Sequence, residues 1–277
     1  MSEKKKVEGS RFLRESKPAL KHLLGILLRK YGYASILAVD SEAKIYSVAA
    51  SGINIGDFGM LCNRGFVIKV YNEGEYAEYS FNKLERDVTE QAQQIIEQIE
   101  ALKKAVPDKL ERIKLGMLED KPLKFSKSTE YEINPFETGA QNIIDKLTAL
   151  RKKGLEADER MLDCTARMSC QKYSKLFLSE NKDMEQNVLW TDCAMSFLAR
   201  RGNEVKSYFS SASNLGGSEI LESLEADIPH SVEMTVALLD SEPMVPGEYD
   251  CICTPEVTGM IVHEAFGHGV EMDMFAK

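Results

Sequence analysis

Residues 65–81 read Gly65-Phe-Val-Ile-Lys-Val-Tyr-Asn-Glu-Gly-Glu-Tyr-Ala-Glu-Tyr-Ser-Phe81. The stretch contains two runs with β-strand composition, Gly65–Tyr71 and Tyr76–Phe81. Between them lies Asn72-Glu-Gly74, a combination of residues typical of tight turns. The stretch therefore predicts two neighbouring strands joined by a turn, and so a β-sheet in the first part of the chain.

Further elements surround these two strands. Ala34–Val39 and Lys44–Val48 also have β-strand character, whereas Pro18–Lys30 and Lys83–Val106 have apolar residues at helical spacing. We expect residues 12–107 to form an N-terminal α/β domain.

The residues that follow, 108–132, are rich in charge and lack a strong periodicity, which indicates a linker. A middle α+β domain is predicted over residues 133–242. It would hold helices over Pro135–Leu150 and Pro229–Leu239, with β-leaning segments between them. The expected β-leaning segments are residues 160–178, 187–199 and 204–212.

Residues 243–277 are predicted to begin a third domain, with a strand over Tyr249–Cys253 and a helix from Pro255 onward. Thr254-Pro255-Glu256 is a helix-start pattern: a hydroxyl residue, then proline, then an acid in the first turn. We expect this helix to be buried, because apolar residues line one side of it. The whole chain is predicted to be α+β, with mixed sheets and packed helices.

Composition limits the classes of function. The 277 residues are 43% hydrophobic and 29% charged, as is usual for globular proteins, and they carry a net charge of −9. The negative charge argues against nucleic acid or an anionic membrane as a main partner. No apolar signal segment follows Lys4–Lys6, and Leu23–Leu28 is too short to cross a bilayer. A cytoplasmic location is expected.

The six cysteines are scattered along the chain, which favours reduced thiols over a disulfide framework. Cys251-Ile-Cys253 forms a CxC pair that could bind metal, support redox chemistry or serve with a histidine in a thiol enzyme. The favoured interpretation is two thiols on one face of a short strand.

Residues 261–271 read Ile261-Val-His-Glu-Ala-Phe-Gly-His-Gly-Val-Glu271 and hold two of the four histidines in the chain. Histidines four apart share one face of a helix and, with an adjacent glutamate, form the H-E-x-x-H zinc motif. Here His263 and His268 are five apart, which places them about 140° apart around a regular helix.

Two distortions would bring the two rings together. One is a wide turn with i→i+5 hydrogen bonding, and the other is a helix that ends at Gly267 so that His268 lies on the next segment. Gly267 and Gly269 flank His268 and would supply backbone freedom in either case. A third interpretation is a cluster of side chains that caps the helix end and binds no metal.

Residues Gly259–Asp273 resemble the HExxxH signature of the TldD/PmbA family of metallopeptidases, in the catalytic TldD-like branch that carries H-E-A-x-G-H-G-x-E. Arg64–Tyr71 is similar to a segment of that family that reads R-G-x-x-x-x-x-Y. Asp240–Cys253, which contains a Pro-Gly pair, resembles the family's approach to the signature. The similarity extends weakly over most of the chain and is specific at the signature.

The resemblance implies that His263 and His268 bind a divalent metal, most plausibly zinc. It implies that Glu264 is the general base on a metal-bound water that hydrolyses a peptide bond. Family members act in the cytoplasm on unfolded or leader peptides. They do so as a homodimer or as a heterodimer with a paralogous PmbA-like subunit.

One feature of the family is missing. The family completes its metal site with a cysteine near its C-terminus, and the chain contains no matching segment. Cys251, Cys253 and Glu271 are the nearest candidates, but the resemblance assigns this role to none of them. We therefore expect this chain alone to be inactive. The alternative function is a non-catalytic or truncated subunit of a TldD/PmbA-like dimer.

Overall fold

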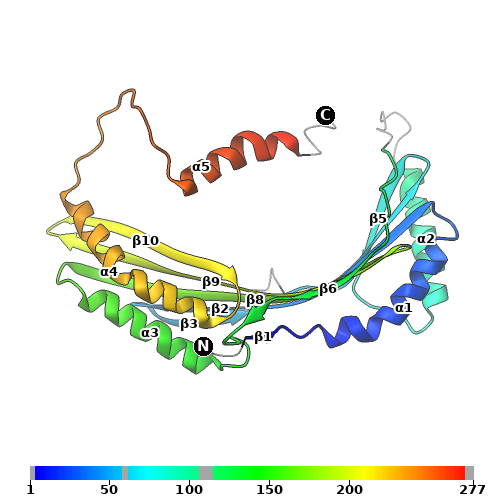
Figure 1. The fold of residues 1–277 in the computed structure, drawn as a ribbon, viewed down its shortest axis with the longest axis horizontal. Coiled ribbons are helices and arrows are strands. Elements are labelled where there is room, and N and C mark those ends of the chain that lie inside the picture. Colours follow the sequence, from blue (N-terminus) through cyan, green and yellow to red (C-terminus); the bar gives the residue numbers. More distant parts are fainter. Residues whose placement is uncertain (1–3, 58–61, 106–114, 272–277) are drawn as a thin grey trace. The chain divides into compact units, whose positions relative to one another are not determined.

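The computed structural model describes residues 4–57, 62–105 and 115–271. The described residues up to Ser241 form one compact unit, and those from Glu242 onward form a second. The chain is coloured from blue to red along its sequence in Figure 1.

The first unit is built on an eight-stranded sheet with the order β10-β9-β8-β2-β4-β5, in which β3 also pairs with β2 and β6 with β9. The pairings are antiparallel except that of β6 with β9, which is parallel, so the sheet is mixed. Its strands are β2 (Tyr33–Ala49), β3 (Gly52–Asp57), β4 (Arg64–Asn72), β5 (Glu75–Phe81), β6 (Leu123–Ser128), β8 (Met161–Ser179), β9 (Lys182–Arg201) and β10 (Glu204–Leu215). A second sheet pairs β1 (Lys5–Lys6) with β7 (Glu130–Tyr131).

Three long strands, β2, β8 and β9, form the centre of the sheet. Along one edge, β2 pairs first with β4 over Tyr33–Asp40 and then with β3 over Lys44–Ala49. Its other edge pairs with β8 from Ser35 to Val48. The turn between β4 and β5 has positive φ at Glu73 and Gly74, and it joins the two strands as residues 65–81 predicted.

Four helices pack against this sheet in two clusters. The described helices are α1 (Arg11–Leu27), α2 (Val88–Ala105), α3 (Ala140–Glu156) and α4 (Leu221–Ala237) in the first unit and α5 (Pro255–Val262) in the second. Among the described residues, no helix combines the length and apolar character that spanning a bilayer requires.

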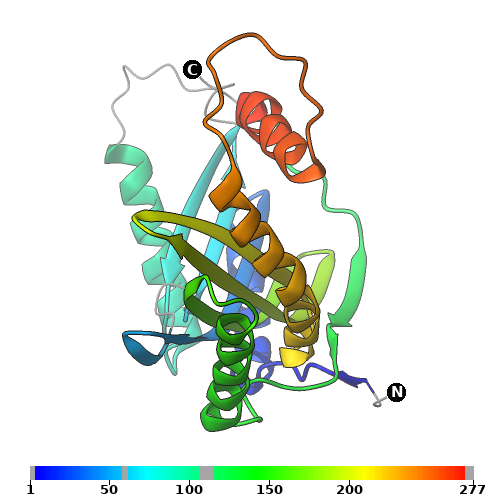
Figure 2. The same cartoon turned by 90° about the vertical axis from the view of Figure 1, so that its left-hand side faces the viewer.

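The two helix pairs cover the same side of the sheet at different places. Ile36 and Ala38 of β2 belong to the core formed with α1 and α2, whereas Tyr46 and Val48 belong to the core formed with α3 and α4. Side chains two residues apart point to the same face of a strand, so these four even-numbered positions share one face. Figure 2 shows α3 and α4 side by side along this face. The α+β fold class predicted from the sequence is confirmed.

Two helices begin earlier than the sequence predicted, and each contains a proline. Pro18 lies inside α1 and Pro229 lies inside α4. Proline in a helix interior removes a backbone hydrogen bond, which is why each was expected near a helix start. The turns before these prolines bury Leu13 and Leu224, and this burial favours the longer helices.

The segment 108–132 is not wholly a linker. Its first part extends outside the described residues, but Leu123–Ser128 is a strand that pairs with β9. The division between residues 12–107 and 133–242 stays a prediction. In the structure, however, strands from both stretches lie in one sheet, because β2 pairs with β8.

In the second unit, α5 begins at Pro255 as expected, but the predicted strand over Tyr249–Cys253 is wrong. These residues have no regular secondary structure, and Ile252 is fully exposed. Alternation of side chains makes a strand only where a neighbouring strand supplies hydrogen-bond partners, and among the described residues nothing pairs with this segment.

A core substitution tests the second cluster. Leu147 of α3 is fully buried, so Leu147→Ala is expected to lower the free energy of unfolding by about 2–5 kcal/mol, through lost apolar contacts and the cavity left behind. Urea denaturation measures the change. Leu102→Ala on α2 is the control, because Leu102 is 57% exposed and its loss should cost less than about 0.5 kcal/mol. Equal effects would contradict this packing.

Glu219 supplies a pH-dependent contact in the first unit. Its carboxylate accepts hydrogen bonds from the backbone N–H groups of Gly217 at 2.8 Å, Ile133 at 3.0 Å and Glu132 at 3.2 Å. Partial burial raises the pKa of Glu219, but these hydrogen bonds outweigh burial and hold its pKa below the ordinary value of 4.5.

A carboxyl group whose pKa is lowered by folding stabilises the folded state above its unfolded pKa, and this stabilisation is lost as the pH falls through the folded pKa. Glu219→Gln is therefore expected to lower stability near neutral pH, with a difference from the unsubstituted chain that shrinks in acid. Denaturant unfolding over this pH range measures it, with Glu222→Gln as control for the loss of one charge. A difference independent of pH would refute this role.

Candidate metal centre

The helix that carries the two histidines begins as its sequence indicates. Thr254 has an extended backbone and Pro255 occupies the first helical turn. The carboxylate of Glu256 accepts hydrogen bonds from its own backbone N–H and from the Thr254 side chain, which lowers its pKa. An anionic side chain in the first turn is favourable because the unpaired N–H groups there carry partial positive charge.

After Val262 the helix widens. Residues His263–Gly267 form a π-helical turn, in which the N–H of His268 donates to the carbonyl of His263. A 3₁₀ turn follows over His268–Val270. Of the two distortions considered for the five-residue spacing, the structure adopts the wide turn with i→i+5 bonding.

Glycine flexibility does not explain this turn. Gly267 has φ −56° and ψ −53°, which are ordinary helical values, and Gly269 is not among the described residues with positive φ. The expectation that the turn requires the backbone freedom of glycine is therefore wrong. The widening arises from the change of hydrogen-bond partner.

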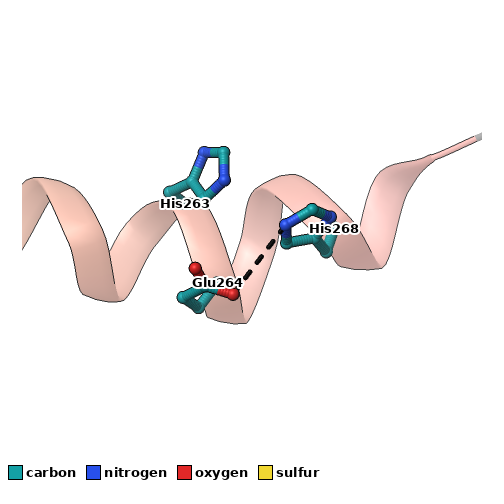
Figure 3. A group of neighbouring side chains, drawn as sticks. All are labelled: His263, Glu264 and His268. Carbon is teal, nitrogen blue, oxygen red and sulfur yellow. Dashed lines mark ion pairs between the residues drawn. The ribbon is translucent and has the colours of Figure 1, made fainter.

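The wide turn brings the two imidazoles together. Their ring centroids lie 4.8 Å apart and the ring planes meet at 79°. Glu264 lies on the same turn, with its Oε2 3.8 Å from Nε2 of His268 (Figure 3). One candidate ligand atom from each of these three residues lies within 4.8 Å of the other two.

These three side chains match the donor chemistry of a zinc-type site. Imidazoles are common ligands of divalent transition metals, and a carboxylate beside them can serve as a further ligand or as a base toward a bound water. Ligand atoms about 2.1 Å from a tetrahedrally coordinated ion are about 3.4 Å from each other. The separation of at most 4.8 Å therefore needs to close by no more than about 1.4 Å, which small side-chain rotations can supply. The residues fit such an ion.

The motif is open to solvent. The side chains of His268 and Glu264 are 51% and 62% exposed. The apolar side chains of Val257, Met260 and Phe266 are also exposed, so the expected burial of this helix is not observed.

The thiols take no part in this cluster. Cys251 and Cys253 are exposed, and the metal-capable group found among the described residues contains neither of them. Cys164, Cys170 and Cys193 are buried, and burial raises their thiol pKa to about 12, 12 and 11. All six cysteines are free, as the sequence predicted.

Glu271, which the sequence offers with Cys251 and Cys253 as a nearby candidate ligand, lies outside the group formed by His263, Glu264 and His268. Its Oε1 lies 2.6 Å from Nδ1 of His268, on the ring nitrogen that does not face Glu264.

Three solved structures share the fold of this chain. TldE from Thermococcus kodakarensis matches with a TM-score of 0.55 and 17% identity, over 80% of this chain and 47% of that chain. The TldD/PmbA resemblance is thus confirmed in the fold. A candidate modulator of DNA gyrase from Thermotoga maritima matches with a TM-score of 0.63 and 15% identity, over 83% of this chain and 50% of that chain. Another candidate modulator, from Bacteroides thetaiotaomicron, matches with a TM-score of 0.55 and 17% identity, over 80% of this chain and 49% of that chain.

Sequence comparison finds a relative whose name states an activity. A protein of Methanothermobacter thermautotrophicus named metalloprotease is 34% identical over 85 residues, which are 30% of this chain and 19% of that protein. No family model matches the chain. The chain spans about half the length of each of these three solved structures.

Metal titration tests the centre. The chain is expected to bind about one equivalent of Zn²⁺, measured by competition with a coloured chelator. His263→Ala or His268→Ala should each weaken binding by about 100-fold or more, beyond the effect typical of residues that only support a ligand. His22→Ala, an exposed histidine on α1, is the control and should bind as the unsubstituted chain does. Zinc binding that survives both substitutions would place the ion elsewhere.

Proposed function

We propose that this chain carries the metal-binding and proton-transfer motif of a peptidase of the TldD type, which hydrolyses peptide bonds in unfolded or leader peptides. The wide turn carries the proposal, because with it one ligand atom each of His263, Glu264 and His268 lies within 4.8 Å of the other two. The relative named metalloprotease supports the same class of reaction.

In this proposal His263 and His268 hold a divalent metal, and the proposed ion is zinc. A metal held there supplies a Lewis acid that polarises a carbonyl and makes water more acidic. Glu264 acts as the general base: its carboxylate, 3.8 Å from Nε2 of His268, would accept a proton from the attacking water and pass it to the leaving amine.

The exposure of the His268 and Glu264 side chains to solvent supports an extended substrate. A peptide without folded structure can reach an exposed helix and can add to the edge of a sheet as a further strand. We place the reaction in the cytoplasm and propose a dimer, with an identical or a paralogous PmbA-like subunit as the partner. A further ligand would complete the metal site in the functional assembly.

The alternative is a subunit that contributes to a TldD/PmbA-like dimer without turnover. Its support is that the metal-capable group found among the described residues has two imidazoles and one carboxylate and includes no cysteine. This alternative predicts association with a partner but no chelator-sensitive cleavage.

Glu264→Gln tests the proposed mechanism in the zinc-loaded assembly. The substitution is expected to lower the rate of cleavage of an unstructured fluorogenic peptide by about 10²–10⁴-fold, because the amide cannot accept the proton. Metal content measured on the same samples should stay at the unsubstituted level. Glu248→Gln, an exposed acid of the second unit, is the matched control.

Two results would contradict the mechanism. Full activity of Glu264→Gln would remove Glu264 from the role of base. Cleavage that persists after chelation and is abolished by thiol alkylation would favour a thiol enzyme that uses Cys251 or Cys253.

A further inference from the structure

Glu271 has a defined place beside His268. The tight 3₁₀ turn over His268–Val270 is closed by the backbone N–H of Glu271, which donates to the carbonyl of His268 at 3.3 Å. Residues three apart in such a turn lie one above the other. The carboxylate of Glu271 is thereby brought to 2.6 Å from Nδ1 of His268.

This contact distinguishes the two nitrogens of the ring. An ionised carboxylate can only accept hydrogen bonds, so Nδ1 must carry the hydrogen. In a neutral imidazole the other nitrogen, Nε2, then has a free lone pair. Nε2 is the atom that faces the carboxylate of Glu264, at 3.8 Å. The ring is therefore oriented with its lone pair toward the group formed with Glu264 and His263.

We infer that Glu271 is a positioning residue for the metal centre: it holds His268 in the Nδ1–H tautomer and presents Nε2 to the ion. The inference rests on the proposed function, since it assigns a role at the same centre. Carboxylates that accept from the second nitrogen of a ligand histidine fix its tautomer and orientation and raise its basicity.

Two other roles for Glu271 predict different results. As a direct ligand, Glu271 would contribute an oxygen to the ion, but its Oε1 is engaged by Nδ1 and it lies outside the group of three. As a surface ion pair it would add little, because both side chains are about half exposed, at 51% and 50%.

Nuclear magnetic resonance tests the tautomer in the metal-free chain. Two-bond proton–nitrogen correlations at about pH 8, where an ordinary imidazole is neutral, report which ring nitrogen carries the hydrogen. The chain has four histidines, so His268 can be assigned from the spectrum of His268→Ala. The Nδ1–H form is expected to dominate for His268 and to give way to a mixture in Glu271→Ala. A mixture already present in the unsubstituted chain would overturn the inference.

Zinc affinity tests the consequence. Glu271→Ala is expected to weaken Zn²⁺ binding by about 10–100-fold. Glu271→Gln should weaken it less, because the amide oxygen still accepts from Nδ1 while the charge is lost. Glu248→Gln is the matched control and should leave affinity unchanged. In the zinc-bound chain the nitrogen shifts of His268 should show the ion on Nε2 and the hydrogen on Nδ1.

The outcomes separate this inference from the proposed function. Unchanged zinc affinity in both Glu271 variants, with binding still dependent on His263 and His268, would overturn only the role of Glu271. Two further results would overturn the role of Glu271 and leave the proposed function intact. One is zinc bound to Nδ1 of His268, and the other is evidence that a carboxylate oxygen of Glu271 is itself a zinc ligand. Failure of the unsubstituted chain to bind zinc at all would overturn both.

Discussion

The candidate centre depends on one backbone hydrogen bond, from the N–H of His268 to the carbonyl of His263. In a regular helix the corresponding bond joins residues four apart, and residues five apart then lie about 140° apart around the axis. Here the accepting carbonyl lies one residue further back along the chain, which widens the turn. The centroids of the two imidazole rings are then 4.8 Å apart. The HExxxH spacing is compatible with a shared ion only because of this change.

The tight turn that follows completes the arrangement. A wide turn over His263–Gly267 and a 3₁₀ turn over His268–Val270 succeed each other directly. The first brings the rings to one side, and the second brings Glu271 to the opposite nitrogen of His268. Irregular helical turns are over-represented at functional sites because they aim side chains in directions that a regular helix cannot reach.

In the first unit the two helix clusters depend on the pairing of β2 with β8. This pairing runs from Ser35 to Val48 and passes under both helix clusters, so α1 and α2 share a sheet with α3 and α4. Apolar residues at alternate positions of β2 contribute to both cores. The predicted domain boundary at the charged segment 108–132 falls between β2 and β8 in the sequence. In the structure these two strands are hydrogen-bonded neighbours in one sheet.

Local features of the sequence predicted several elements well. The strand–turn–strand over residues 65–81 and the start of α5 at Pro255 were identified from short patterns and are present in the structure. A short pattern also gave His263, Glu264 and His268, which lie close together, and their roles stay a prediction. Propensity, turn chemistry and motif spacing are properties of neighbouring residues, so they can be recognised without knowledge of the fold.

Tertiary structure decided the rest. Leu123–Ser128 became a strand because β9 offers it hydrogen-bond partners 59 residues away, while Tyr249–Cys253 has none among the described residues. Pro18 stays inside α1 because the turn before it buries apolar surface. The choice between a wide turn and a helix end at Gly267 was also left open by the residues alone. The outcomes at Leu123–Ser128, Tyr249–Cys253 and Pro18 depend on which partner a backbone group or side chain meets in space, and a short stretch of sequence does not contain that information.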